Sequence, residues 1–145
     1  MADVFDNPVF PYFAFYATVV VLKTMAMSFC TVFHRLTKKV FVNPEDSAGR
    51  GVKPSTHESV ERVRRCHLND LENVIPFVLI GLLYTATGPS LGSALLHFRI
   101  FTGARILHTI AYLLPLPQPS RGLGFIVGIL VTMSMAWSIL SNSKY

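Results

Sequence analysis

The sequence is short of charged residues and of cysteines. Only 14% of its 145 residues are Asp, Glu, Lys or Arg, whereas 51% are hydrophobic and the mean hydropathy is +0.45. This composition excludes an ordinary soluble globular domain and predicts an integral membrane protein. The two cysteines, Cys30 and Cys66, fit no spacing known for zinc sites or redox pairs. We therefore expect neither a metal centre nor a disulfide.

Basic residues outnumber acidic ones, which gives a formal net charge of +5. Such a charge can indicate nucleic-acid binding. Here, however, the basic residues gather between two apolar runs, where the positive-inside bias of membrane proteins explains them. We therefore expect no nucleic-acid partner. The first apolar run is too long for a signal peptide and lacks a small-residue cleavage pattern, which predicts a retained membrane span.

Four long apolar segments predict an all-α, integral membrane four-helix bundle formed by a single domain, residues 1–145. Each segment can cross about 30 Å of hydrocarbon at about 1.5 Å per residue. Gly88-Pro89 and the proline-rich stretch 115–119 separate the last three helices. The expected helices cover residues 9–36, 57–87, 90–114 and 120–141, with a loop at 37–56.

Local signals refine these boundaries. Residues 43–46 have the composition of a turn, and Ser55 followed by Glu58 predicts a capping box that starts the second helix. Ser120 can cap the last helix, where Gly124 and Gly128 predict a close contact with another helix. The positive-inside bias places the loop 37–56 in the cytosol and both termini on the opposite side.

A dense polar cluster, residues 61–73, runs without a break into the apolar part of the second helix. Helical geometry places Arg65, Asn69 and Glu72 on one face, whereas Arg64 and His67 point elsewhere. A helix that is polar almost all round needs partners on more than one side. Neighbouring helices, a second subunit or a polar ligand could supply them.

Two residues within the spans have interpretations of their own. Pro76 leaves the carbonyl of Glu72 without its usual helical partner and predicts a kink there. Proline can also be tolerated in a membrane helix simply for packing. We expect Lys23, an isolated cation in the first helix, to pair with Asp70 or with a carbonyl at a helix end.

The third helix contains a second group of polar residues. Arg105, His108 and Tyr112 are spaced by three and four residues and therefore share a face. Arg121, in the first turn of the fourth helix, combines a guanidinium with the positive end of the helix dipole. Several arginines with one glutamate suit glutathione, which has two carboxylates, an amine and a thiol. Arg121 and the phenol of Tyr112 are candidates to stabilise its thiolate.

These segments resemble the family of membrane-associated proteins in eicosanoid and glutathione metabolism (MAPEG). The resemblance lies in residues 61–77 and continues through residues 43–46, 96–101, 103–106, 108–112 and 115–119. It is closer to the glutathione transferases of the family than to the prostaglandin and leukotriene synthases. Ser47 stands where mammalian transferases of this kind have a reactive cysteine.

The resemblance implies a homotrimer with glutathione bound between subunits near the cytosolic face. The implied activities are conjugation of glutathione to hydrophobic electrophiles and glutathione-dependent peroxidase activity on lipid hydroperoxides. The implied location is the endoplasmic reticulum membrane, with the mitochondrial outer membrane as a second site. The catalytic residues implied are Arg121 and Tyr112. The glutathione-binding residues implied are Arg35, Arg64, Arg65, His67, Asn69, Glu72, Arg105, His108 and Tyr112.

Three alternatives remain at this point. The chain could be a prostaglandin E or leukotriene C synthase, or a non-catalytic lipid-binding adaptor of the same family. Retention of Arg65, Asn69, Glu72, Tyr112 and Arg121 argues against the adaptor. A small transporter is disfavoured because the charges cluster at one membrane face. If Arg64 and His67 also contact glutathione, the ligand must wrap round the helix end or meet faces of two subunits.

Overall fold

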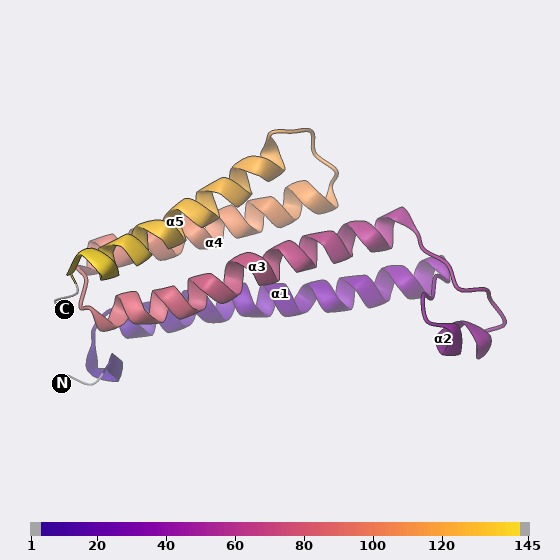
Figure 1. Cartoon of the computed structure of the whole chain (residues 1–145), viewed down its shortest axis with the longest axis horizontal. Coiled ribbons are helices and arrows are strands. Elements are labelled where there is room, and N and C mark those ends of the chain that lie inside the picture. The colour runs from indigo at the N-terminus through magenta and orange to yellow at the C-terminus, as the bar shows by residue number, and fades with distance from the viewer. Residues whose placement is uncertain (1–3, 143–145) are drawn as a thin grey trace.

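The computed structural model describes residues 4–142, which form one short 3-10 helix and five α-helices. Figure 1 shows long helices that run along the molecule and a short α-helix at the end remote from the termini. The elements are η1 (Val4–Asp6), α1 (Phe10–Lys38), α2 (Pro44–Ala48), α3 (Glu58–Ala86), α4 (Leu91–Leu113) and α5 (Ser120–Asn142).

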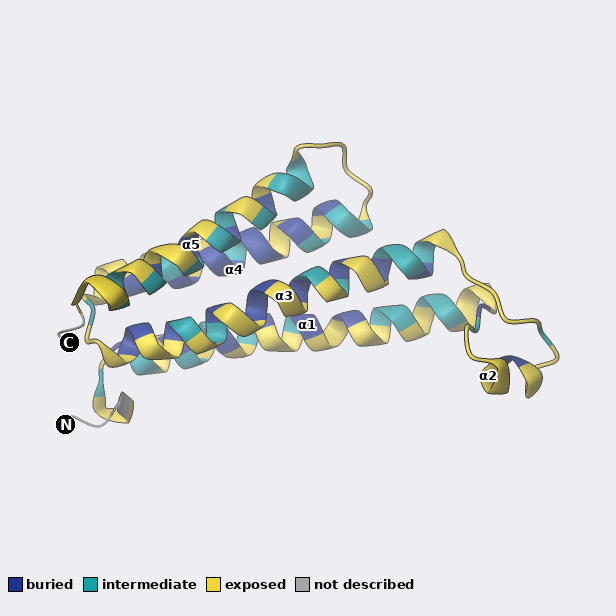
Figure 2. Ribbon diagram, viewed as in Figure 1, coloured by how far each residue is buried: buried dark blue, intermediate teal, exposed yellow. Residues whose placement is uncertain are grey.

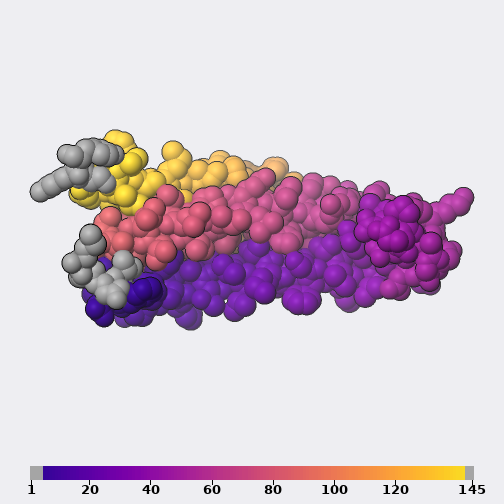
Figure 3. Space-filling view, turned by 60° about the horizontal axis from the view of Figure 1, so that its bottom comes forward, coloured from indigo at the N-terminus to yellow at the C-terminus, as the bar shows by residue number. Residues whose placement is uncertain are grey.

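The long helices lie in two antiparallel pairs, as Figure 1 shows. α1 packs mainly against α3, and α4 packs mainly against α5. Contacts of α3 with α5 and of α1 with α4 join the pairs. In the space-filling view of Figure 3, α1 and α3 lie side by side along their length. This arrangement brings the polar first half of α3 to the same end of the molecule as the start of α5.

Three helices, α1, α3 and α5, are long and apolar enough to cross a membrane. α4 is not among them, although it has 23 residues. It contains Arg99, Arg105 and two histidines, which lower its apolar character. Large apolar side chains on the long helices, such as Phe29 and Trp137, are exposed, and exposed positions follow the outer faces of the helices in Figure 2. Faces of this kind are suited to contact with lipid.

The segment between α1 and α3 is more regular than the sequence predicts. Residues 43–46 were expected to form a turn, but Pro44 begins the short helix α2. Proline suits the first helical position, and the acidic side chains of Glu45 and Asp46 complement the helix dipole. The buried Ser47 hydroxyl lies within hydrogen-bonding distance of the carbonyls of Asn43 and Phe41, at 3.0 and 3.2 Å. These contacts tie α2 to the irregular segment that precedes it, residues 40–43.

Both predicted serine caps are wrong. The ring nitrogen Nδ1 of His57 accepts the backbone N–H of Ser59, so His57 and not Ser55 caps α3. Ser120 is the first residue of α5, and its hydroxyl donates to the carbonyl of Pro117 instead of accepting from the helix. Side-chain caps depend on the chain direction just before the helix, which residue type alone does not determine.

The core is aromatic near the middle of the long helices. The rings of Phe77 and Phe101 are stacked with their centroids 3.7 Å apart, and Phe98 packs edge-on against Phe77. α3 continues as a helix through Pro76. The predicted close contact at Gly124 is confirmed, because a Cβ atom there would lie only 2.9 Å from the Cβ of His108. α4 and α5 therefore approach closely beside the residues expected to bind glutathione.

Candidate functional site

A buried ionic centre joins α1, α3 and α4. Asp70 is fully buried, and one of its carboxylate oxygens accepts from both Lys23 and Arg105. The expected pairing of Lys23 with Asp70 is therefore confirmed. Arg105 is also fully buried, and its Nη2 lies 2.7 Å from Asp70 Oδ1 and 2.8 Å from Asn69 Oδ1. One carboxylate thus connects cations from two other helices in the interior.

This centre changes how Arg105 is interpreted. The sequence predicts Arg105 as a glutathione-binding residue, yet its guanidinium is directed at α3 inside the molecule. It orients the Asn69 amide by donating a hydrogen bond to the carbonyl oxygen of that side chain. The NH₂ group of Asn69 then remains as a donor on the other side of the amide. Arg105 therefore positions the Asn69 side chain, and its contact with glutathione stays a prediction.

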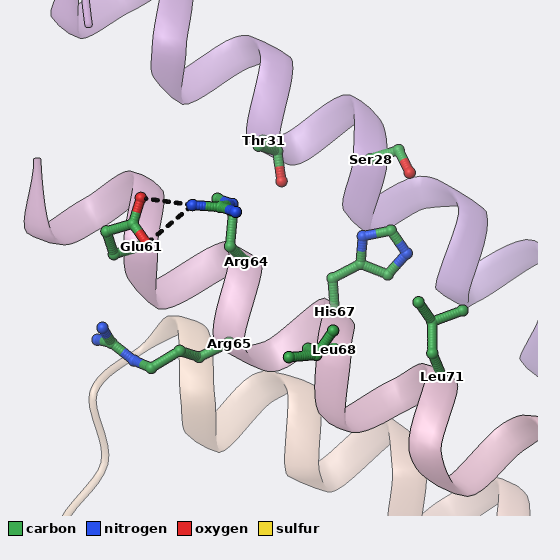
Figure 4. Close-up of a pocket in the computed structure, with 8 residues that line it drawn as sticks. All are labelled: Ser28, Thr31, Glu61, Arg64, Arg65, His67, Leu68 and Leu71. Carbon is green, nitrogen blue, oxygen red and sulfur yellow. Dashed lines mark hydrogen bonds and ion pairs between the residues drawn. The ribbon is translucent and has the colours of Figure 1, made fainter. Parts of the chain in front are cut away.

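A pocket of about 360 Å³ lies between α1 and α3, and we call it the α1–α3 pocket. Figure 4 shows Arg64 and His67 reaching from α3 toward Ser28 and Thr31 of α1, whereas Arg65 extends away from these two hydroxyls. The Arg64 guanidinium lies 3.0 Å from each carboxylate oxygen of Glu61. The lining residues are Ser28, Thr31, Glu61, Arg64, Arg65, His67, Leu68 and Leu71.

A second polar pocket, of about 240 Å³, lies where α3, α4 and α5 meet; we call it the α5 pocket. Its lining residues are Asn69, His108, Tyr112, Gln118, Arg121, Gly122 and Phe125. The Arg121 guanidinium lies over the Tyr112 ring, 5.1 Å from its centroid. The Nδ1–H of His108 donates to the Arg121 carbonyl at 3.0 Å, which ties α4 to the first turn of α5. The structure thus brings together four of the predicted site residues.

Arg121 is suited to bind an anion. No carboxylate among residues 4–142 pairs with it, and its Nε is buried without a hydrogen-bond partner there. It lies in the first turn of α5, where the helix dipole adds partial positive charge. The Tyr112 ring beside it supports the guanidinium through a cation–π contact. A thiolate in this pocket would meet an unneutralised cation.

The two pockets lie on different sides of α3. His67 lines the first pocket and Asn69 lines the second. Residues two apart in an α-helix differ by about 200° around its axis. A ligand of tripeptide size bound to one chain would have to pass round α3 to contact both residues. The sequence predicts this separation, and the structure shows each side chain on its own face.

Two predicted site residues, Arg35 and Glu72, lie outside the two pockets, and a third, Arg65, lines the α1–α3 pocket with an exposed side chain. Arg35 lines a smaller pocket of about 190 Å³ beneath the segment that contains α2, together with Asp46 and Arg50. Glu72 is exposed on α3 and forms no ion pair within the described part of the chain. Arg65 is also exposed and pairs with Glu58, with 2.7 Å between Nη2 and Oε1.

Sequence reasoning missed several lining residues. Ser28 and Thr31 of α1 face the α1–α3 pocket, and Gln118 and Phe125 line the α5 pocket. Ser28 and Thr31 are small polar residues spaced by three in an apolar run, which was a usable signal. Gln118 lies in the linker before α5, and only the folded linker shows which way it faces.

Within residues 4–142, no group of three or more His, Cys, Asp or Glu side chains could hold a metal ion. Both cysteines are free, and Cys66 is buried with its Sγ 3.9 Å from the Thr109 hydroxyl. The polar residues of the two pockets are mainly cations, hydroxyls and amides, which bind carboxylates and peptide groups, and Glu61 is the one carboxylate among their lining residues. The arrangement is that of a site for an anionic peptide-like molecule.

Comparison with known proteins agrees with this chemistry. Residues 13–141 match the MAPEG family. Microsomal glutathione S-transferase 1 from pig is 57% identical, over 100% of this chain and 97% of the relative. The mouse protein of the same name is 57% identical over 100% and 99%, respectively. Prostaglandin E synthase from horse is 39% identical over 90% of this chain and 86% of the relative. The expectation drawn from the sequence motifs is therefore confirmed, and the chain belongs to the MAPEG family.

Proposed function

We propose that this chain is a membrane glutathione transferase that conjugates glutathione to hydrophobic electrophiles. The observation that carries the proposal is Arg121, a cation without a carboxylate partner in residues 4–142, beside Tyr112 in the α5 pocket. The relatives at 57% identity are named glutathione S-transferases and cover the full length of this chain. The more distant prostaglandin E synthases make that activity the second candidate.

The chemistry requires a glutathione thiolate, because the thiol itself is a weak nucleophile. Arg121 and the positive end of the α5 dipole stabilise the negative sulfur, and the Tyr112 hydroxyl can donate a hydrogen bond to it. The thiolate sulfur forms a bond to the electrophilic carbon as the leaving group departs with its electron pair. With a lipid hydroperoxide, two glutathione molecules are oxidised to the disulfide, and the products are an alcohol and water.

Glutathione would contact two subunits of a homotrimer. The residues that match the family motif fall into the α1–α3 pocket, with Arg64 and His67, and the α5 pocket, with Asn69 and Arg121. In a closed ring of three copies, one copy's α1–α3 pocket can face the next copy's α5 pocket. The exposed carboxylate of Glu72 is then available to the glutathione amine. Arg35, close to the cytosolic end of α1, would bind a glutathione carboxylate.

The same proposal includes the membrane arrangement. All four long helices would cross the bilayer as one domain over residues 1–145, and Arg105 and both histidines of α4 contact the neighbouring helices α3 and α5. The segment 37–56 would lie in the cytosol, and both termini would lie in the lumen of the endoplasmic reticulum or between the mitochondrial membranes. Glutathione would enter from the cytosol, and the electrophile would enter from the lipid.

Arg121→Ala tests the catalytic assignment. We expect turnover of a chromogenic aryl halide to fall about 100-fold, the effect typical of losing one preorganised donor to a developing anion. Glutathione affinity, measured by calorimetry, should change much less because other residues hold the tripeptide. Wild-type turnover in this variant would contradict the assignment. A purified protein that instead isomerises a prostaglandin endoperoxide and ignores aryl halides would favour the second candidate.

Mixed oligomers test the shared site. An Arg64→Ala, His67→Ala double variant damages only the α1–α3 pocket, and Arg121→Ala damages only the α5 pocket. In a trimer containing both kinds of chain, some interfaces combine two undamaged pockets. Co-expression should therefore restore part of the activity that each variant lacks alone. If each site lies within one chain, the mixture will show no more activity than the sum of its parts.

A further inference from the structure

A further cavity lies between α4 and α5, apart from the α1–α3 pocket and the α5 pocket. Its volume is about 520 Å³, and it shares no lining residue with the α1–α3 pocket or the α5 pocket. Small residues, including Gly103 and Ala104, leave space beside α4, and Leu107 and Leu123 form apolar walls. A volume of this size holds one small-molecule ligand. We call this cavity the α4–α5 groove.

Arg99 is the one charged residue that lines the groove. It shares a helix face with Gly103 and Leu107, since these positions are spaced by four residues. Its Nε donates to the Tyr16 hydroxyl at 3.2 Å, and no carboxylate of residues 4–142 pairs with it. The Nε contact leaves the terminal N–H groups of the guanidinium to bind other acceptors.

The position of Arg99 in α4 favours an anionic partner. It lies eight residues beyond Leu91, which is about 12 Å from the helix end. In the membrane arrangement proposed above, an exposed arginine at this depth is costly without an acceptor. The groove continues along α4 from Arg99 to Ala111, a length of about 18 Å. A cation at one end of a long apolar groove is complementary to a molecule with an anionic head and one apolar chain.

A second copy of this chain is a poor candidate for that partner. The only acidic residues within the four long helices are those of α3, and Glu72 is the exposed one nearest to its C-terminal end. Glu72 lies 14 residues before Ala86, which is about 21 Å from that end of the bundle. Arg99 lies much nearer to the same end. No helix of a second copy therefore offers a carboxylate at the depth of Arg99.

We propose that the α4–α5 groove binds a long-chain fatty acid from the bilayer, with its carboxylate on Arg99 and its chain directed toward Ser120. A planar guanidinium binds a carboxylate through two parallel hydrogen bonds. The chain then lies against Leu107 and Leu123 and ends beside the first turn of α5, on the opposite side from the α5 pocket. This binding does not depend on the transferase activity proposed above.

Photolabelling tests the site directly. The full-length protein in neutral phosphatidylcholine nanodiscs is irradiated with a sixteen-carbon fatty acid that has a diazirine at the end of its chain. We expect labelled peptides from residues 107–127, and we expect palmitate to compete far better than the alcohol of equal length. Equal competition by the alcohol would overturn the carboxylate assignment. Labels on the α1–α3 face, or cross-links showing that a second copy covers the groove, would overturn the site.

Two variants test the contact with the fatty-acid carboxylate and the contact with its hydrocarbon chain separately. Arg99→Gln should raise the dissociation constant of the fatty acid about tenfold, equivalent to about 1.4 kcal/mol. Gly103→Leu should block the chain without disturbing the fold, since nothing lies within 4 Å of a Cβ atom placed at Gly103. Lys53→Gln removes one positive charge from the exposed segment before α3 and is the matched control. An unchanged affinity in both groove variants, with unchanged unfolding temperatures, would refute the proposal.

Discussion

The helix α3 has two sets of ion pairs that differ in burial and therefore in what they do. Near its start, Glu58 and Glu61 pair with Arg65 and Arg64, whose side chains are 49% and 50% exposed. Farther along, Asp70 pairs with cations from two other helices and is fully buried. Exposed pairs contribute about 0–1 kcal/mol each. Breaking a buried pair by removing one partner costs about 3–5 kcal/mol.

This difference separates residues that can bind a ligand from residues that hold the helices together. Arg64 can exchange Glu61 for a ligand carboxylate at little cost, because both partners remain in contact with water. Arg105 cannot do so without leaving Asp70 in the interior with one partner fewer. We therefore propose that the outer set, Glu58, Glu61, Arg64 and Arg65, serves recognition. The inner set, Lys23, Asp70 and Arg105, holds the helices together. Three predictions test this division, in order of expected size.

The largest effect is expected for Asp70→Ala. The change leaves the buried Arg105 and the partly buried Lys23 without their shared carboxylate. We expect the free energy of unfolding in detergent to fall by about 3–5 kcal/mol. Denaturant titration followed by circular dichroism would measure it. Glu61→Gln is the matched control and should change stability by less than about 1 kcal/mol. Equal effects of the two changes would remove the distinction between the sets.

The sequence predicted one half of the inner set and missed the other. Lys23 is the only lysine deep within an apolar run, and Asp70 lies in the polar cluster of the next helix, so their pairing could be expected. Arg105 shares a helix with Arg99, and periodicity does not show which of them points inward. That choice depends on how α4 rotates against α3, which side-chain packing decides.

The residues of the candidate site could also be predicted only in part from the sequence. Helical geometry predicted that His67 and Asn69 lie on different faces, because the angle between two residues follows from their spacing alone. The spacing of Ser28 and Thr31 was a signal for a polar face of α1, but it did not show which helix they face, and nothing in the sequence indicated that Gln118 lines a pocket. Helical geometry could not predict α2 either, whose buried Ser47 hydroxyl contacts carbonyls that only the folded segment brings near.

A smaller effect is expected for Arg64→Ala, which concerns the outer set. Removing a charge-assisted hydrogen bond to a ligand carboxylate should raise the dissociation constant of glutathione about tenfold, or about 1.4 kcal/mol. Stability should stay within about 0.5 kcal/mol of wild type, since the side chain is half exposed. Arg62→Ala is the control, because Arg62 pairs with Glu58 but does not line the α1–α3 pocket. A loss of stability without a loss of glutathione affinity would show that Arg64 has the structural role of the inner set.

The smallest effect is expected for Glu61→Gln. In the structure both carboxylate oxygens of Glu61 accept from the Arg64 guanidinium, so a bound ligand must compete with them. Neutralising Glu61 removes this competitor, and we expect glutathione to bind about two- to threefold more tightly, within the range of one exposed ion pair. Calorimetry at low and high salt would measure the change. The gain should shrink as salt rises, because added ions screen exposed charges. Weaker binding in this variant would show that Glu61 contacts the ligand itself. The Glu61–Arg64 ion pair would then bind the ligand as a unit, without breaking.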